Sequence, residues 1–323
     1  MAEIGKDIAK AKALLEQGKL VAIPTETVYG LAGNALDASS VTKIFAAKDR
    51  PFFDPLIVHV PDVDAVKKYT EEIPDKASSL MKEFWPGPIT LLLNKKDIIP
   101  DLVTSGLDRV GVRCPNHELT RELLKSLSFP LAAPSANPFG YVSPTKPEHV
   151  NEQLGGKIDY ILDGGECNIG IESTIVGFEN DSAIIYRVGG LSVEKIELII
   201  GEVVVSTQPV SNPLVPGQLQ SHYAPRKILK IGNIEKLLEE CKHIKISVLS
   251  FQKRYASDSI EKQIVLSASG DLNEAAQKLF SALRELDKST AEIILSEEVP
   301  DIGLGRAIND RLRRASVNSK FQI

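Results

Sequence analysis

Polar side chains that could bind a charged small molecule gather in three segments of the chain. The first segment is residues 24–30, PTETVYG, where Glu26 stands between Thr25 and Thr27 directly after a short apolar run. Loops that follow strands commonly carry ligand sites. A plain turn closed by threonine hydroxyls is the alternative, and Tyr29 is typical of a buried core ring.

The second segment, AAKDRPFFDPLIVHV, carries two cations and a histidine. Lys48 and Arg50 lie two residues apart at the end of a predicted helix. They would offer an ammonium point charge and a guanidinium fork to a triphosphate. Cations in a last helical turn also complement the helix dipole, which leaves a purely structural role open. His59 fits either a core imidazole or a hydrogen-bonding partner of a small polar ligand.

The third segment, LAAPSANPFGYVSPT, places Ser135 and Asn137 directly after a run of small residues. Small side chains let a ligand approach the backbone closely, and a hydroxyl next to an amide suits a phosphate or a purine. Ser143 and Thr145 follow, and they either join such a site or cap the next helix.

Three more polar residues stand at the ends of expected strands. Arg113 in VGVRCP suits a bidentate contact with a carboxylate, although a surface arginine is the commoner case. Ser173 in IESTIV and Arg187 in YRVGG are ambiguous in the same way. The chain has no GxxxxGK[ST] loop, no GxGxxG, no HExxH and no Ser-His-Asp order. The residues alone therefore indicate strand-end loops that fit an anionic small molecule.

Apolar runs and helical patterns alternate over the first 200 residues, which predicts a mixed α/β sheet covered by helices. A first helix is expected over residues 6–17. Strands are expected at residues 20–23, 56–60, 89–93, 110–113, 131–133, 158–162, 174–176 and 184–186, and helices at 39–47, 62–69, 76–84, 118–127 and 148–154.

The composition changes after Gly201 and predicts a second domain. The stretch VVVSTQPVSNPLVPGQLQSHYAPRK holds four prolines and little helical periodicity. We therefore expect a catalytic domain at residues 1–201, a linker at 202–227 and a small three-layer α/β domain at 228–323. In that domain, strands are expected at 245–251, 263–266 and 292–295, and helices at 272–286 and 305–315.

Bulk properties narrow the class of protein. A chain of 323 residues with 43% hydrophobic residues can bury a sizeable core. No apolar run approaches the ~20 residues that span a bilayer, and the start resembles a charged amphipathic helix more than a signal peptide, so a soluble cytoplasmic protein is expected. Cys114, Cys167 and Cys241 are widely spaced, which predicts reduced thiols and no zinc site. A net charge of −5 argues against stable binding to nucleic-acid backbones.

Taken in order, PTETVYGLAGNA, KDRPFFDPLIVHV, FWPGPITLLL, VGVRCPNH, APSANPFG and ESTIV resemble the YrdC type of threonylcarbamoyl-AMP synthase. The KxR and SxN signatures of that family correspond to Lys48 with Arg50 and to Ser135 with Asn137. The SHYAP sequence and the smaller domain after it resemble the long, two-domain form. The sequence departs from the family at Asp54, where asparagine is frequent, and at Ala32 and Asn34 in GLAGNA.

The resemblance implies a twisted open mixed sheet with a concave basic cavity. It also implies a nucleotidyltransferase that makes L-threonylcarbamoyl-AMP from L-threonine, bicarbonate or CO₂, and ATP with Mg²⁺, releasing pyrophosphate. The product would serve threonylcarbamoyladenosine modification of tRNA, with hand-over to a tRNA threonylcarbamoyl transferase.

The resemblance assigns residues to two groups of contacts. Threonine contacts would be Thr27, His59, Arg113 and Ser173, with Arg113 pairing the amino-acid carboxylate. Nucleotide contacts would be Lys48, Arg50, Ser135, Asn137, Ser143 and Arg187, together with Tyr223 from a linker that covers the cavity, and Lys48 and Arg50 would be catalytic.

Two other functions remain open from the sequence. The same fold could make a different carbamoyl-adenylate, as YrdC-like domains do within larger carbamoyltransferases. It could also be a double-stranded RNA-binding module, against which the acidic net charge weighs.

Overall fold

The computed structural model describes residues 1–180, 182–206, 211 and 213–317, and this part of the chain forms two compact units. The N-terminal unit comprises residues 1–139, 144–168 and 172–219. The C-terminal unit comprises residues 140–143 and 169–171 together with the chain from residue 220 onward. The expected linker at 202–227 includes residues 207–210 and 212, and the expected small domain includes residues 318–323, all of which lie outside the described residues.

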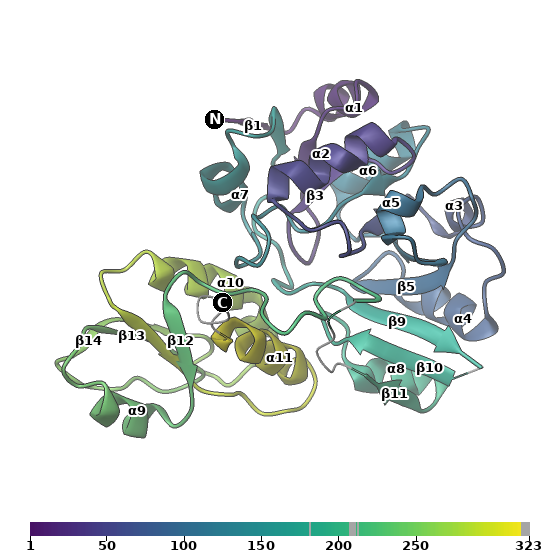
Figure 1. The fold of residues 1–323 in the computed structure, drawn as a ribbon. Helices are drawn as coiled ribbons and strands as arrows, with labels where there is room; N and C mark the ends of the chain where they lie inside the picture. The colour runs from purple at the N-terminus through teal and green to yellow at the C-terminus, as the bar shows by residue number, and fades with distance from the viewer. Residues whose placement is uncertain (181, 207–210, 212, 318–323) are drawn as a thin grey trace. The chain divides into compact units, whose positions relative to one another are not determined.

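The N-terminal unit is built on one mixed sheet (Figure 1). Its described strands follow the order β1 (Glu3–Gly5), β8 (Tyr160–Leu162), β2 (Val21–Ile23), β3 (Gly30–Asn34), β7 (Leu131–Ala132), β4 (Ile57–His59), β6 (Arg109–Arg113), β5 (Ile89–Asn94), β9 (Thr174–Glu179), β10 (Ser182–Arg187) and β11 (Val203–Val205). Its helices are α1 (Ile8–Glu16), α2 (Ala38–Lys48), α3 (Val63–Val66), α4 (Asp75–Phe84), α5 (Asp101–Thr104), α6 (Glu118–Ser126), α7 (Pro147–Leu154) and α8 (Val193–Ile200).

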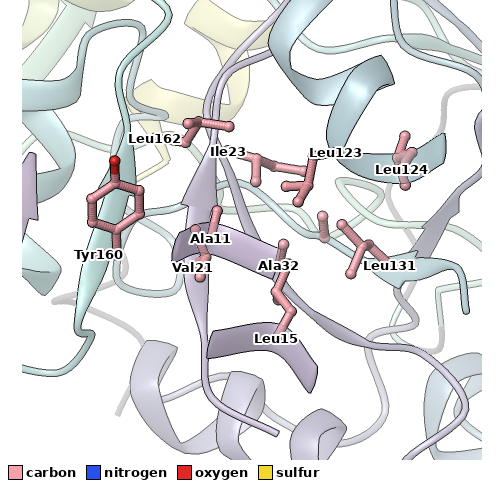
Figure 2. Close-up of a cluster of buried hydrophobic side chains, with 11 residues drawn as sticks. Ala11, Leu15, Val21, Ile23, Ala32, Leu123, Leu124, Leu131, Tyr160 and Leu162 are labelled. Carbon is pink, nitrogen blue, oxygen red and sulfur yellow. The ribbon is translucent and has the colours of Figure 1, made fainter. Parts of the chain in front are cut away.

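A hydrophobic cluster fixes helices α1 and α6 against one half of this sheet (Figure 2). Leu15 of α1 and Leu123 of α6 are fully buried among side chains of β2, β3, β7 and β8. Full burial of a leucine side chain stabilises the fold by roughly 1.5–3 kcal/mol. This packing anchors the ends of the strands from which the polar loops leave.

Strand pairing brings distant polar residues to one region of the sheet. Strands β4 and β6 are parallel neighbours, and their register pairs His59 with Arg113 at the carboxyl ends of both strands. Strands β5 and β9 are also parallel, with Ile89 paired to Thr174. Strand β2 ends at Ile23, opposite Gly30 of β3, so the PTETVYG segment connects two antiparallel neighbours.

The C-terminal unit is a small three-layer α/β domain. Its strands β12 (Ile228–Ile231), β13 (Ile246–Ser250), β14 (Ile260–Val265) and β15 (Ile293–Ser296) are all parallel, in the order β12-β15-β13-β14. Its helices are α9 (Ile234–Glu240), α10 (Leu272–Asp287) and α11 (Gly305–Ser316). The crossovers through α9 and α10 run in opposite directions along the sheet, and right-handed connections therefore place these helices on opposite faces (Figure 1).

The expected fold class is confirmed, and the expected apolar strands of the first domain all appear with bounds shifted by a few residues. Strand β3 was not expected, because GLAGN is poor in residues that favour strands. It forms because Leu31 and Ala32 are fully buried between β2 and β7. Gly30 lies close to Ala133, which shortly precedes the SxN motif. A Cβ at position 30 would come within 3.2 Å of the Ala133 side chain, so a small residue suits position 30.

Among the described residues, no helix is long and apolar enough to cross a membrane.

Candidate active site

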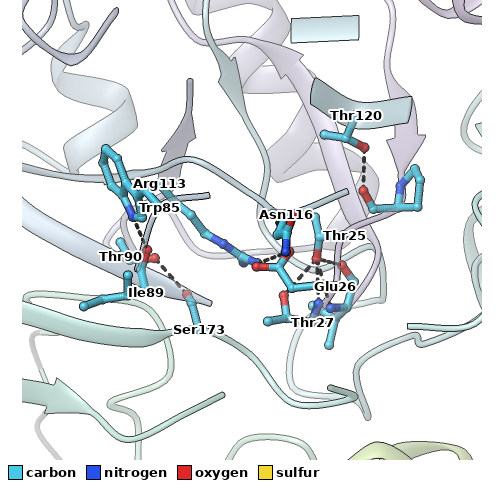
Figure 3. A network of polar contacts seen from close by, with 12 residues as sticks. Thr25, Glu26, Thr27, Trp85, Ile89, Thr90, Arg113, Asn116, Thr120 and Ser173 are labelled. Carbon is cyan, nitrogen blue, oxygen red and sulfur yellow. Dashed lines mark hydrogen bonds and ion pairs between the residues drawn. The ribbon is translucent and has the colours of Figure 1, made fainter. Parts of the chain in front are cut away.

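A buried ion pair joins the PTETVYG segment to the end of β6. Arg113 Nη2 lies 2.8 Å from Glu26 Oε2, and the two side chains are only 5% and 6% exposed. Glu26 Oε2 also accepts a hydrogen bond from the backbone N–H of Asn116, at 3.1 Å. Figure 3 shows the two side chains pointing toward one another. The pair places a guanidinium and a carboxylate together in a water-poor environment.

Hydroxyl groups shape the same segment. Thr25 Oγ1 lies 2.8 Å from Thr27 Oγ1, donates to the carbonyl of Val28 and accepts from the N–H groups of Thr27 and Val28. The threonine-closed turn that the sequence left as an alternative is therefore present, and it holds Glu26 (Figure 3). Tyr29 is a fully buried ring whose hydroxyl donates to the carbonyl of Gly165 at 2.7 Å.

His59 is a buried, uncharged imidazole beside Arg113. Burial is the main cause that lowers the pKa of His59 to about 3, and the neighbouring Arg113 cation lowers it further. Its Nδ1 atom is buried and has no hydrogen-bond partner among the described residues. The strand register thus places a residue with a buried, unpartnered nitrogen beside Arg113.

Ser173 contacts Arg187, and the resemblance assigns these two residues to different substrates. Its hydroxyl lies 2.8 Å from Thr90 Oγ1, and Arg187 Nη2 donates to the same hydroxyl at 3.1 Å. Arg187 also donates twice to the Ser173 carbonyl and once to the carbonyl of Pro216. A predicted threonine contact and a predicted nucleotide contact are therefore in direct contact with one another.

Lys48 is held by the SxN loop. The last residue of α2, it is 1% exposed, and its Nζ donates to the carbonyls of Ser135 at 2.5 Å and of Asn137 at 2.6 Å. Burial, reinforced by the nearby Arg50 cation, lowers the pKa of Lys48 well below its ordinary value. Hydrogen bonds from Lys48 thus connect the KxR signature to the SxN signature.

Arg50 forms a second buried ion pair. Its Nη2 lies 2.9 Å from Asp54 Oδ2, and its guanidinium donates to the carbonyls of Asp54 and Pro55. Burial raises the pKa of Asp54, while the charges of Arg50, Lys48 and Arg187 oppose that shift. Asp54, which departs from the family pattern, therefore lies within electrostatic reach of three cations.

The remaining two predicted nucleotide contacts belong to the C-terminal unit. The carbonyl of Ser143 accepts a hydrogen bond from Arg284 Nε of α10, at 3.2 Å. Tyr223 is 1% exposed, stacks on Phe280 at 5.7 Å and lies under the Arg311 guanidinium at 4.8 Å. Its backbone adopts a left-handed conformation with φ 61°. Both residues are fixed by neighbours within that unit.

Glu26, Thr90 and Asn116 contact predicted site residues, and the sequence did not single them out for a role. The sequence marks Glu26 only as the residue between two threonines. A charged residue that follows a buried strand is a weak sign of a functional role. Only the fold shows that Glu26 forms an ion pair with Arg113.

Comparison with known proteins identifies the family. Residues 13–189 match a family model described as telomere recombination, and residues 191–317 match one described as threonylcarbamoyl-AMP synthase, C-terminal domain. The chain is 42% identical to the threonylcarbamoyl-AMP synthase of Pyrococcus abyssi, over 95% of this chain and 93% of that protein. It is 40% identical to the threonylcarbamoyl-AMP synthase of Bacillus subtilis, over 96% and 92%.

The chain belongs to the threonylcarbamoyl-AMP synthase family. The resemblance drawn from the sequence motifs is therefore confirmed. The structure also matches that of P. abyssi Sua5 complexed with L-threonine, with a TM-score of 0.91, 39% identity and coverage of 98% of this chain and 97% of that one. Members of the threonylcarbamoyl-AMP synthase family are enzymes, and the match extends over both units of this chain.

The buried histidine predicts a specific pH dependence of stability. The pKa of His59 is about 3 in the fold and 6.5 for an ordinary histidine, so the unfolded chain binds the proton more readily between these values. Acidification through this window therefore favours unfolding, by about 1.4 kcal/mol per pH unit from this residue. We expect His59→Gln to lose stability less steeply than the wild type as the pH falls from 6.5.

Urea unfolding followed by the fluorescence of Trp85, the single tryptophan of the chain, measures this difference. Identical slopes of unfolding free energy against pH in the two proteins would contradict a neutral, buried His59.

Proposed function

We propose that this chain makes L-threonylcarbamoyl-AMP from L-threonine, bicarbonate or CO₂, and ATP, with release of pyrophosphate. The observation that carries the proposal is the contact between Ser173 and Arg187, because the reaction requires the amino acid and the nucleotide to meet at one place. Membership of the threonylcarbamoyl-AMP synthase family supports the same reaction.

Arg113 is the residue proposed to bind the carboxylate of threonine. Its Nε atom has no hydrogen-bond partner among the described residues, and its Nη2 atom pairs with Glu26 Oε2 at 2.8 Å. These two atoms form the edge of a guanidinium that binds a carboxylate in a bidentate manner. His59, Thr27 and Ser173 complete the proposed threonine contacts, and the family relative whose structure is complexed with L-threonine supports this substrate.

The triphosphate of ATP is proposed to bind near Lys48, Arg50 and Arg187. All three are buried cations that act together on the carboxyl of Asp54. Ser135 and Asn137 lie on the loop whose carbonyls hold Lys48, and they are proposed to contact the nucleotide. A phosphate near Lys48 would favour its charged form, which burial otherwise disfavours.

The chemistry needs positioning and positive charge more than a nucleophilic side chain. The threonine amine adds to CO₂, or to bicarbonate with loss of water, and gives N-carboxy-threonine. Its carboxylate oxygen then attacks the α-phosphorus of ATP in line, and the bond to pyrophosphate breaks as pyrophosphate leaves with the electron pair. Lys48 and Arg50 are the proposed catalytic residues, because they would stabilise charge on phosphoryl oxygens.

Ser143 and Tyr223 stay predictions as nucleotide contacts, and so does the role of the linker as a cover of the cavity. The contacts of these residues with Arg284 and Phe280 give them fixed positions within the C-terminal unit.

Mg²⁺ is proposed to enter with ATP. The described residues include no group of three or more potential metal ligands, but Mg²⁺ in nucleotide sites is held largely by phosphates and water, with one or two carboxylates from the protein. Asp54 fits that part, because its Oδ1 is buried without a hydrogen-bond partner among the described residues. The ion would supply charge neutralisation on the phosphates.

The product is proposed to serve threonylcarbamoyladenosine modification of tRNA. A mixed anhydride is reactive, so hand-over to a tRNA threonylcarbamoyl transferase would protect it from water. A cytoplasmic location stays a prediction. Synthesis of a different carbamoyl-adenylate is the rival reaction, and the choice of amino acid distinguishes the two.

Pyrophosphate release from ATP in the presence of bicarbonate tests the reaction. We expect release with L-threonine, much less with valine, which lacks the hydroxyl, and with serine, which lacks the methyl, and none without amino acid. A site built around a hydroxyl discriminates strongly against ligands without it. Release that is independent of the amino acid would contradict the proposal.

The buried cations Lys48, Arg50 and Arg187 around Asp54 predict the effect of removing Lys48. In the same assay, Lys48→Ala is expected to lower turnover by more than about tenfold, because a buried charge that stabilises the transition state is lost. Lys43→Ala is the matched control, since Lys43 lies exposed on the same helix and donates to the carbonyl of Gly18. Near-normal turnover of Lys48→Ala would exclude the residue from catalysis.

A further inference from the structure

Unused polar atoms gather around the Glu26–Arg113 pair. Glu26 Oε1 and Arg113 Nε are buried and have no hydrogen-bond partner among the described residues. The ion pair itself uses Glu26 Oε2, which also accepts from the N–H of Asn116. Arg113 Nη2 makes the ion pair with Oε2, so Glu26 Oε1 and Arg113 Nε are the atoms of this preformed pair that remain available.

Buried polar atoms without partners are costly, by about 1–3 kcal/mol each and more when charged. Both side chains are at least nine-tenths buried. Their free atoms carry opposite charge, so a ligand that satisfies both must itself carry both charges. A simple anion would satisfy the guanidinium alone and would be repelled by the carboxylate.

An α-amino acid has the required form. Its ammonium and carboxylate sit on the same carbon, and Arg113 Nη2 and Glu26 Oε2 lie 2.8 Å apart. A ligand carboxylate on Arg113 and a ligand ammonium on Glu26 would arrange four charges in alternating sign. Each charged group then has two neighbours of opposite charge. Their attraction offsets the cost of removing the ligand charges from water.

We propose that Glu26 binds the α-ammonium group of the amino-acid substrate through Oε1, so that Glu26 and Arg113 together recognise the zwitterion. This inference rests on the proposed function, since it names the group that selects the substrate class at that site. Glu26 thereby excludes hydroxy acids and simple carboxylic acids, which lack the amine that must react with CO₂ or bicarbonate. Arg113 alone would accept such ligands.

A neighbouring feature helps to set this selectivity. The imidazole of His59, the next group beside Arg113, is uncharged in the fold. A cationic histidine would compete with the ammonium for Glu26, whereas a neutral one leaves Glu26 as the charged partner of that group.

The test compares two ligands in direct binding by calorimetry. One is L-threonine, and the other is 2,3-dihydroxybutanoate of matching configuration, in which a hydroxyl replaces the ammonium. The wild type is expected to prefer L-threonine by about tenfold or more, as for a hydrogen bond between charged groups. In Glu26→Gln that preference is expected to fall to within about threefold, because binding of the amine is weakened and binding of the hydroxy acid is not.

A purely structural role of Glu26 gives a different result. If Glu26 only orients Arg113, its replacement changes the affinity for both ligands by the same factor and the preference persists, which overturns the inference. Glu83→Gln, which alters an exposed carboxylate of the same unit, is the matched control and should keep the wild-type preference.

Two outcomes separate this inference from the function on which it rests. A wild type that does not bind L-threonine overturns the proposed function itself, whereas threonine binding with an unchanged preference in Glu26→Gln overturns only the role of Glu26. If Glu26→Gln does not fold, a crystal structure of the wild type with L-threonine decides. The α-nitrogen within hydrogen-bond distance of Glu26 supports the inference, and its placement elsewhere overturns it.

Discussion

Burial of charge at the ends of the strands is the constraint on which the rest of the N-terminal unit depends. Lys48, Arg50, Asp54, Arg113 and Glu26 are each at most 6% exposed. Removing an ion from water costs several kcal/mol unless nearby groups compensate. The compensation here comes from two ion pairs and from backbone carbonyls, and the loops have the shapes that bring those carbonyls to the cations.

The order of the strands explains how this arrangement arises. Parallel pairing of β4 with β6 sets His59 beside Arg113, and the antiparallel pair β2 and β3 presents Glu26 to the same guanidinium. Helix α2 ends at Lys48, whose ammonium donates to the carbonyl of Ser135, 87 positions away in the sequence. Buried groups held from several elements are positioned rigidly, and such preorganisation suits a reaction that depends on positioning. Stability and the proposed function therefore depend on the same contacts.

Much of the fold follows from local sequence patterns, because apolar runs and helix caps act over a few residues. The strands around Val58, Val112 and Ile161 and the helix that ends at Lys48 are of this kind. Strand β3 could not be predicted in this way, since its glycines and alanines form a strand only between two particular neighbours.

The residues of the candidate site could be named from the sequence, but their pairings could not. Motif resemblance pointed to Lys48, Arg50 and Arg113 as individual residues. It did not reveal that Asp54 neutralises Arg50, that Glu26 faces Arg113, or that Ser173 touches Arg187. Each of these contacts joins residues through strand order or loop geometry, and a spacing in the sequence carries no information about them. The position of Tyr223 against Phe280 depends in the same way on the packing of the C-terminal unit.

The proposed reaction joins threonine, inorganic carbon and AMP in a single product. Mass spectrometry of the products formed from ATP, L-threonine and ¹³C-bicarbonate tests it most directly. We expect a threonylcarbamoyl-adenylate that carries the label in its carbamoyl carbon and appears together with pyrophosphate. An adenylate without the label, or AMP attached directly to the carboxylate of threonine, would contradict it.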